Sequence, residues 1–233
     1  MIEIRNLTKV YGKQTVLNLP FLTINKGESF GLVGNNGAGK TTMFRCVLDL
    51  IRPNTGTVLS NNNNVAITEA WKNYTGSFLD DGFLIDFLTP EEYFRFVADV
   101  YKLSEGDLAA FYHDFEDFFN NEILGKKKLI RNLSSGNRQK IGISAALMPK
   151  PEVIVLDEPF NSLDPSTQIR LKTILKSWKK EKEITMLISS HDLNHITEVS
   201  SRIVILHEGN IVHDLITNPD TLRVLENYFA VKS

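Results

Sequence analysis

The sequence of 233 residues predicts an α/β fold with a mostly parallel core sheet, an N-terminal antiparallel β layer and an inserted α-helical subdomain. Short apolar runs without alternation indicate parallel strands that are covered on both faces. These runs are residues 29–33, 153–156, 184–188 and 202–206. Helical patterns lie between them, and strands that alternate with helices are typical of an open α/β sheet. The length fits one domain with an inserted subdomain.

The N-terminal segment, roughly residues 1–30, has a different pattern. Apolar and polar residues alternate there over short stretches, as at Ile2 and Ile4, and this alternation predicts an antiparallel β layer. Residues 57–78 also have β character. The run of four asparagines at 61–64 favours the tip of a hairpin, because asparagine tolerates the backbone conformations of tight turns.

A glycine-rich loop follows the first apolar strand. Residues 34–41, Gly-Asn-Asn-Gly-Ala-Gly-Lys-Thr, fit the pattern G-x-x-x-x-G-K-[ST], and a helical segment follows at 42–50. The glycines let backbone N–H groups face phosphate oxygens, and the helix N-terminus adds a partial positive charge. Lys40 can reach the β- and γ-phosphates, and the Thr41 hydroxyl can bind Mg²⁺.

We therefore expect a P-loop NTPase fold that binds a nucleotide through this phosphate loop. The residues expected to contact the nucleotide are Gly34, Asn35, Asn36, Gly37, Ala38, Gly39, Lys40, Thr41 and Thr42. The alternative is a glycine-rich turn between a strand and a helix that holds no ligand.

Residues 89–147 are predicted to be helical, and they are rich in phenylalanine. Thr89, Pro90 and Glu92 form the pattern of a capping box with proline in the first turn. Nine of the 14 phenylalanines lie between positions 78 and 119. We expect Phe94, Phe111 and Phe115 in the core of the helical subdomain, and exposed aromatic positions near Phe78, Phe83 and Phe87. The alternative is that all nine are core residues.

Two carboxylates, Asp157 and Glu158, follow the apolar run at 153–156. In an open α/β sheet, ligands bind outside the carboxyl ends of the strands. Asp157 is therefore expected to hold the Mg²⁺ shell, and Glu158 to orient or deprotonate an attacking water. A solvated strand end is the alternative, and the phosphate loop upstream favours the functional interpretation.

These elements, in this order, resemble the ATP-binding subunit of an ABC transporter over about residues 1–215. Residues 133–140, Leu-Ser-Ser-Gly-Asn-Arg-Gln-Lys, are similar to the family's LSGGQ signature and the start of its helix. Residues 162–164 resemble its D-loop, and Asp164 is also the predicted N-cap of a helix at 166–178. His191, at a strand end, resembles the switch histidine. Tyr11 stands where the family stacks an aromatic ring on adenine.

The resemblance implies one ABC ATPase domain over residues 1–233, with 80–147 as an inserted helical subdomain that carries the signature. Ser134 and the Gly136 amide open a helix, which is a second anion-binding arrangement. In the family this segment closes on the nucleotide of a second ATP-binding subunit, so two copies form a two-fold dimer. The resemblance therefore assigns Glu158 and His191 to catalysis, and Ser134, Ser135, Gly136, Asn137 and Asp164 to nucleotide binding across that dimer. Alone, these residues would fit a capped helix and a structural histidine.

The sequence departs from the family pattern at three positions. Ser135 replaces the second glycine of the signature, and Asn137 replaces its glutamine. Alignment of the flanking residues places Asp80 where the family has the glutamine of its Q-loop, with Asp81 as the alternative if the register slips by one. We expect the Asp80 carboxylate to join Asp157 near Mg²⁺; the alternative is a side chain in solvent.

The resemblance implies ATP hydrolysis coupled to transport by a separate membrane permease, with export favoured, a homodimer of ATP-binding subunits, and a place on the cytoplasmic face of the membrane. No apolar run approaches the roughly 18 residues that span a bilayer. The alternative is a soluble ABC ATPase that acts on nucleic acid or ribosomes. A net charge of −2 and the lack of a long heptad segment argue against nucleic acid as a partner. A third possibility is an inactive ATPase-like subunit.

Overall fold

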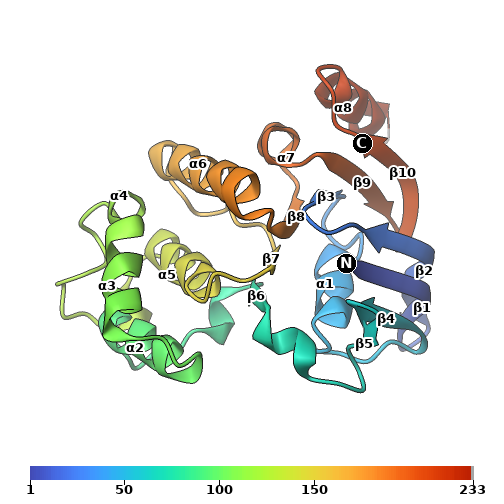
Figure 1. The fold of residues 1–233 in the computed structure, drawn as a ribbon. Coiled ribbons are helices and arrows are strands. Elements are labelled where there is room, and N and C mark those ends of the chain that lie inside the picture. Colours follow the sequence, from blue (N-terminus) through green and yellow to red (C-terminus); the bar gives the residue numbers. More distant parts are fainter. Residues whose placement is uncertain (232–233) are drawn as a thin grey trace.

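The core of the protein is a six-stranded sheet with the order β10-β9-β3-β8-β7-β6, seen in a computed structural model that describes residues 1–231 (Figure 1). Five neighbouring strands are parallel, and β10 pairs antiparallel with β9. The strands are β3 (Ser29–Val33), β6 (Thr75–Phe78), β7 (Val153–Leu156), β8 (Thr185–Ser190), β9 (Arg202–His207) and β10 (Asn210–Ile216). The four predicted parallel strands and the mostly parallel core sheet are confirmed.

A four-stranded antiparallel sheet, β2-β1-β4-β5, forms the predicted N-terminal layer. Its strands are β1 (Ile2–Tyr11), β2 (Gln14–Ile24), β4 (Thr55–Ser60) and β5 (Asn63–Asn64). Asn61 and Asn62 have φ angles of 48° and 64° and turn the chain between β4 and β5. The asparagine run is therefore a hairpin tip, as predicted.

Helix α1 (Lys40–Val47) lies between the two sheets (Figure 1). Its buried residues Met43 and Phe44 share one apolar cluster with Ile4 of β1 and Phe30 of β3. The opposite face of the core sheet packs against a second cluster, which includes Leu156 and the helices that follow. The core sheet is thus covered on both faces, which explains why its strands read as unbroken apolar runs.

The predicted helical region contains α2 (Pro90–Val100), α3 (Glu105–Asp114), α4 (Glu116–Phe119) and α5 (Ser135–Leu147), which lie on the side of the molecule away from the N-terminal layer (Figure 1). Thr89 and Glu92 form the predicted capping box of α2. The later helices are α6 (Pro165–Lys182), α7 (Leu193–Val199) and α8 (Thr221–Val231), and short 3-10 helices occupy Ala70–Asn73, Asp81–Phe83 and Ile130–Asn132. Within residues 1–231, no helix has both the length and the apolar character that crossing a bilayer requires.

Strand β6 was not predicted as part of the core sheet. It lies within residues 57–78, for which β character is predicted, but its sequence, Thr-Gly-Ser-Phe, has too few apolar residues to indicate a buried parallel strand. The small residues are needed because β6 packs directly against α5: a Cβ at Gly76 would lie 2.1 Å from the Ala146 carbonyl oxygen. Close backbone contact of this kind leaves no periodic pattern in the sequence.

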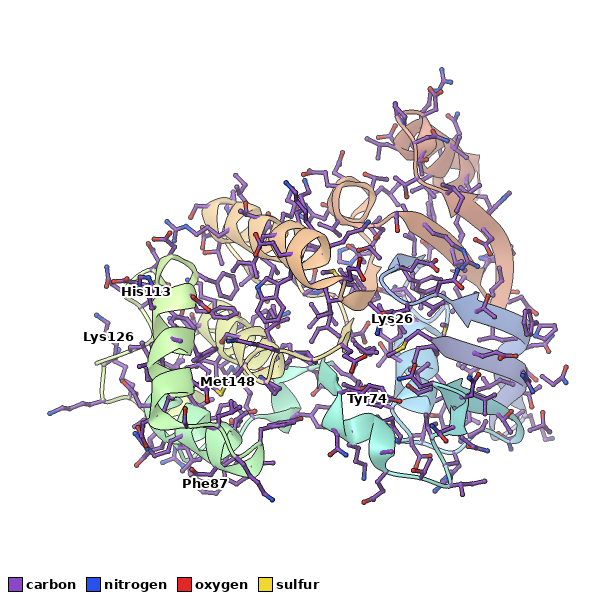
Figure 2. All side chains as sticks on the ribbon, in the orientation of Figure 1. Lys26, Tyr74, Phe87, His113, Lys126 and Met148 are labelled. Carbon is purple, nitrogen blue, oxygen red and sulfur yellow. The ribbon has the colours of Figure 1, made fainter. Side chains whose placement is uncertain are left out.

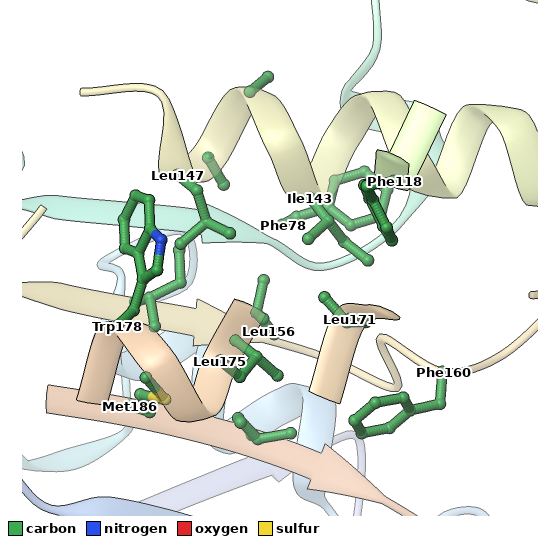
Figure 3. Close-up of a cluster of buried hydrophobic side chains, with 14 of the residues drawn as sticks. Phe78, Phe118, Ile143, Leu147, Leu156, Phe160, Leu171, Leu175, Trp178 and Met186 are labelled. Carbon is green, nitrogen blue, oxygen red and sulfur yellow. The ribbon is translucent and has the colours of Figure 1, made fainter. Parts of the chain in front are cut away.

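The phenylalanines of this region form the two predicted populations, with one correction. Phe94 and Phe111 are buried and pack edge to face, with ring centroids 5.0 Å apart. Phe83 and Phe87 are 53% and 70% exposed. The expected exposure at Phe78 is wrong: its ring packs on Gly142 of α5, where a Cβ would lie 2.0 Å from the ring. Figure 3 shows Phe78 among buried side chains of α5 and α6.

Candidate active site

The phosphate loop surrounds a cavity of about 390 Å³ at the carboxyl end of β3. The cavity is lined by Gln14, Val16, Asn35, Asn36, Gly37, Ala38, Gly39, Lys40, Thr41, Thr42 and Glu158. Its volume lies in the range of small-molecule sites. Gly39 has a φ of 107°, and a Cβ there would lie 2.7 Å from the Val16 carbonyl oxygen, so only glycine fits this turn. The structure thus brings eight of the nine phosphate-loop candidates to one cavity, and Gly34 lies immediately before them.

Lys40 begins α1, and its side chain crosses the phosphate loop. Its Nζ donates a hydrogen bond to the Gly34 carbonyl oxygen at 2.7 Å and lies 3.3 Å from Glu158 Oε1. The side chain is almost fully buried. The ammonium group is therefore held between the loop backbone and the carboxylate that follows β7, where a phosphate would find it preorganised.

Asp157 is buried at the end of β7 and accepts hydrogen bonds from two hydroxyl groups. Thr41 Oγ1 donates to one carboxylate oxygen and Ser189 Oγ to the other. Burial raises the pKa of the Asp157 carboxyl, and the two hydroxyl donors oppose that shift. Thr41 and Asp157, two of the three predicted metal ligands, are in direct contact.

Glu158 lies between Lys40 and His191. His191 Nδ1 is 2.8 Å from Glu158 Oε2, and the His191 backbone N–H donates to the same oxygen at 3.2 Å. The structure therefore brings together the two residues that were assigned to catalysis. His191 follows β8, and β8 is the neighbour of β7 in the sheet, so this meeting is a consequence of the parallel strand order.

The signature segment lies at the start of α5 and does not line the phosphate-loop cavity. Ser134 is the N-cap of α5, and its Oγ accepts from the Asn137 backbone N–H at 3.3 Å. Gly136 packs against the D-loop, since a Cβ there would lie 2.6 Å from the Ser162 carbonyl oxygen. The nucleotide-binding candidates of one chain therefore form two separate groups.

Asp164 caps α6, as predicted. Its carboxylate accepts from the Thr167 backbone N–H at 3.0 Å and from the hydroxyl groups of Ser166 and Thr167 at 2.6 Å each. The Ser166 and Thr167 hydroxyls, followed by the Thr167 N–H, hold the pKa of Asp164 well below its usual range. The side chain is fully engaged with its own helix.

Tyr11 lies at the end of β1, opposite Gln14 of β2. Gln14 lines the phosphate-loop cavity, whereas Tyr11 does not. The Tyr11 ring is half exposed, and Lys9 Nζ lies 5.0 Å from its centroid. The ring is therefore beside the cavity, on the hairpin that forms one of its walls.

Asp80 and Asp81 lie between β6 and α2, and each faces an arginine. Asp80 Oδ2 is 3.5 Å from Arg45 Nη2, and Asp80 Oδ1 accepts from the Gly82 N–H at 2.9 Å. Asp81 Oδ2 is 2.9 Å from Arg138 Nη2. Asp80 is thus placed by α1, and it is not among the residues that line the cavity.

Sequence reasoning missed two residues that contact the acidic pair. Ser189 Oγ donates to Asp157 and accepts from the Glu158 backbone N–H at 2.8 Å. Gln139 Nε2 donates to the Glu158 carbonyl oxygen at 3.3 Å. Ser189 could have been found from register, because it lies two residues before His191 on the strand beside β7. The sequence carries no comparable signal for Gln139.

The sequence matches the family described as "ABC transporter" over residues 17–161. It is 36% identical over 220 residues to the bacitracin transport ATP-binding protein BcrA of Enterococcus faecalis, covering 92% of this chain and 69% of that protein. It is 31% identical to the lantibiotic transport ATP-binding protein SrtF of Streptococcus pyogenes, covering 91% and 89%.

Solved structures give the same picture of the fold. An ATP-binding subunit of an ABC transporter superposes with a TM-score of 0.82 at 27% identity, covering 97% of this chain and 93% of the other. A dimeric ATP-binding cassette in a post-hydrolysis state, bound to ADP and phosphate, superposes with a TM-score of 0.82 at 24% identity, covering 94% and 99%. The chain therefore belongs to the ABC transporter family, as an ATP-binding subunit that hydrolyses ATP.

Proposed function

We propose that this chain drives export through a separate membrane permease, as one of two identical ATP-binding subunits. Members of the family work as dimers with a transmembrane permease. Support for a role in the transport of peptide antibiotics comes from two relatives, which are ATP-binding proteins of bacitracin transport and of lantibiotic transport. The observation that carries the hydrolytic part is the contact of Glu158 with both Lys40 and His191, beside the cavity that Lys40 and Glu158 line.

The phosphate loop is proposed to hold the β- and γ-phosphates of ATP through its backbone N–H groups and Lys40. Thr41 and Asp157 present oxygen atoms, which are the ligands that Mg²⁺ prefers. In the part of the chain that the structure describes, no group of three or more His, Cys, Asp or Glu side chains could hold a metal alone. Thr41 and Asp157 therefore fit a Mg²⁺ that takes its other ligands from phosphate and water.

Glu158 is the proposed general base. Its carboxylate is at present held by Lys40 and His191, which are both donors that phosphate oxygens would also attract. When the γ-phosphate takes those donors, Glu158 is released toward a water at the same phosphate and can accept its proton. His191 would then contact the γ-phosphate and respond to its loss.

A second copy of the chain is proposed to complete each site. The phosphate loop and the signature segment, with Ser134, Ser135, Gly136 and Asn137, form separate groups within one chain. A two-fold axis can bring the signature segment and Asp164 of each copy to the nucleotide of the other. Residues 80–147 would move as the inserted helical subdomain that carries the signature, within one ABC ATPase domain over residues 1–233. Tyr11 would stack on adenine.

Phe83 and Phe87 are proposed to dock the permease, which would hold the chain on the cytoplasmic face of the membrane. Both are more than half exposed and lie between β6 and α2 (Phe87 is labelled in Figure 2). Exposed aromatic side chains in a contiguous surface mark interaction sites. An experiment tests the whole proposal: the chain and its permease are reconstituted in vesicles, and peptide antibiotic efflux is measured with ATP. Efflux without ATP, or efflux that Lys40→Ala leaves unchanged, would contradict it.

A further inference from the structure

We infer that Gln139 is a positioning residue for ATP hydrolysis, which holds the backbone of Glu158 and makes the place of its carboxylate depend on the signature helix α5. This inference rests on the proposed role of Glu158 as the general base. The contact of Gln139 with Glu158 joins two parts of one chain: α5, which carries the signature segment, and the loop that follows β7.

The backbone of Glu158 adopts a conformation that a residue with a side chain rarely takes. Its φ angle is 49°, in the left-handed region. A Cβ atom crowds the following carbonyl oxygen in this region, so glycine is its usual occupant. Non-glycine residues in such a conformation persist only where the surroundings hold them, and they cluster at functional sites. The contacts that hold Glu158 are therefore part of how the site is built.

Two side chains hold the Glu158 backbone, one at each polar group. Ser189 Oγ accepts from the N–H at 2.8 Å, and Gln139 Nε2 donates to the carbonyl oxygen at 3.3 Å. Ser189 is fully buried in β8, the strand beside β7 in the same sheet. Its contact is fixed by the sheet. The contact of Gln139 depends on where α5 lies relative to that sheet.

Gln139 lies between two charged residues of α5, and its side-chain amide is the group that donates to the Glu158 carbonyl oxygen. Its neighbours are bound elsewhere: Arg138 pairs with Asp81, and Lys140 Nζ lies 2.8 Å from Glu122 Oε2. The buried face of α5, with Ile141, Ile143 and Leu147, fixes the rotation of the helix about its axis. With that rotation fixed, the Gln139 amide points at the Glu158 carbonyl oxygen.

The contact has a consequence for the carboxylate of Glu158. Its side chain must lie between Lys40 and His191, at 3.3 Å and 2.8 Å, and rotation of the Glu158 backbone would move it away from both. Displacement of α5 removes the donor at the carbonyl oxygen and leaves Ser189 as the side chain that holds the Glu158 backbone. The Glu158 backbone is thus held at both of its polar groups only while the signature helix is docked on the sheet.

A double-mutant cycle tests the inference, with steady-state and single-turnover ATPase rates as the readout. Gln139→Leu removes the donor and keeps the volume, and Gln139→Met is the second variant if the first does not fold. We expect kcat to fall about 10-fold, as for the loss of one positioned hydrogen bond, with the KM for ATP unchanged. In a Glu158→Gln background the same substitution should have no further effect, because the two residues act as a unit.

Gln168→Leu is the matched control. Gln168 Nε2 donates to the Phe160 carbonyl oxygen at 3.1 Å, so it makes the same kind of bond to the same loop two residues further on. It should leave kcat unchanged. An unchanged kcat in Gln139→Leu, or an equal loss in the Glu158→Gln background, would overturn the inference while Glu158 remains the base. A wild-type rate in Glu158→Gln alone would instead overturn the proposed base, and the inference with it.

Discussion

The carboxylate of Asp81 lies 2.9 Å from the guanidinium of Arg138, which joins the segment after β6 to the signature helix. The preceding residue, Asp80, faces Arg45 on α1, the helix that begins at the phosphate loop. Two adjacent acids are therefore paired with two different helices. The acidic pair thus joins the segment after β6 to α1, which begins at the phosphate loop, and to α5, which carries the signature segment.

The Asp81–Arg138 pair is expected to contribute a small, salt-sensitive stabilisation. Both side chains are partly exposed, so solvent screens their attraction. In a double-mutant cycle of Asp81→Asn and Arg138→Gln, urea unfolding should give a coupling free energy of about 0.5–1 kcal/mol at low salt. The exposed pair Asp220–Arg223 is the control and should give a smaller value. Equal coupling in both pairs would contradict the expectation.

Glu158→Gln is expected to trap an ATP-bound dimer. The substitution removes the proposed base but leaves Lys40, Thr41 and Asp157 to bind the nucleotide. Hydrolysis should slow by at least the roughly 10²-fold typical of a lost general base. Gel filtration with ATP and Mg²⁺ should then show a dimer. Glu152→Gln, one residue before β7, is the matched control. A monomeric variant with the wild-type rate would show that Glu158 is not the base.

Lys40→Ala is expected to weaken ATP binding itself. It removes a buried ammonium group that is proposed to contact the β- and γ-phosphates. Hydrogen bonds to charged groups contribute about 1.5–3 kcal/mol, so affinity should fall by about tenfold or more. Calorimetric titration with ATP measures it. Lys26→Ala removes an exposed lysine that pairs with Glu152 and should bind normally. If both variants bind ATP with the affinity of the wild type, Lys40 does not contact the phosphates.

Replacement of Phe83 and Phe87 by serine is expected to release the permease without affecting ATP binding. Both rings are exposed, so their loss should cost little stability in the isolated chain. Co-purification with the permease from detergent measures the contact. Phe21→Ser is the control, since Phe21 is 59% exposed on the N-terminal layer. Permease retention by the double variant equal to that of the control would exclude these rings from docking.

Asp80→Gln is expected to lower the Mg²⁺ concentration needed for half-maximal ATPase activity. A third carboxylate near Asp157 and Glu158 would make closure depend on the cation, because like charges at short range repel. This role requires Asp80 to leave Arg45 when ATP binds. Magnesium titrations of both forms measure it. Superimposable curves would mean that Asp80 stays with Arg45 and takes no part in the metal site.

The sequence predicted most of the fold because the strands and caps leave local signals. The apolar run 153–156, the capping box at Thr89 and the N-cap at Asp164 are patterns within a few residues. The place of β6 in the core sheet left no such signal, because its fit depends on the contact of Gly76 with the distant helix α5.

The same limit applies to the site. The phosphate loop and the acidic pair could be found from motifs, and their meeting follows from the order of parallel strands. The contacts of Gln139 and Arg45 could not be predicted from the sequence. Each residue contacts a partner more than a dozen positions away in the chain, and no motif fixes the distance between the two positions. The buried place of Phe78 was missed for the same reason: Gly142, which makes room for its ring, lies on another element.

The contact between β6 and α5 limits how the signature helix can travel. Gly142 lets the Phe78 ring lie directly on the helix backbone, and Gly76 lets the strand touch the Ala146 carbonyl. Rotating α5 about its axis would drive Ile141 or Ile143 into that ring, because successive residues lie about 100° apart around a helix, whereas tilting the helix about the contact displaces neither. Tilting of α5 about these two glycines would therefore displace the signature segment at its N-terminal end. A methyl group at either glycine would push α5 away from β6 and change the point about which the helix tilts.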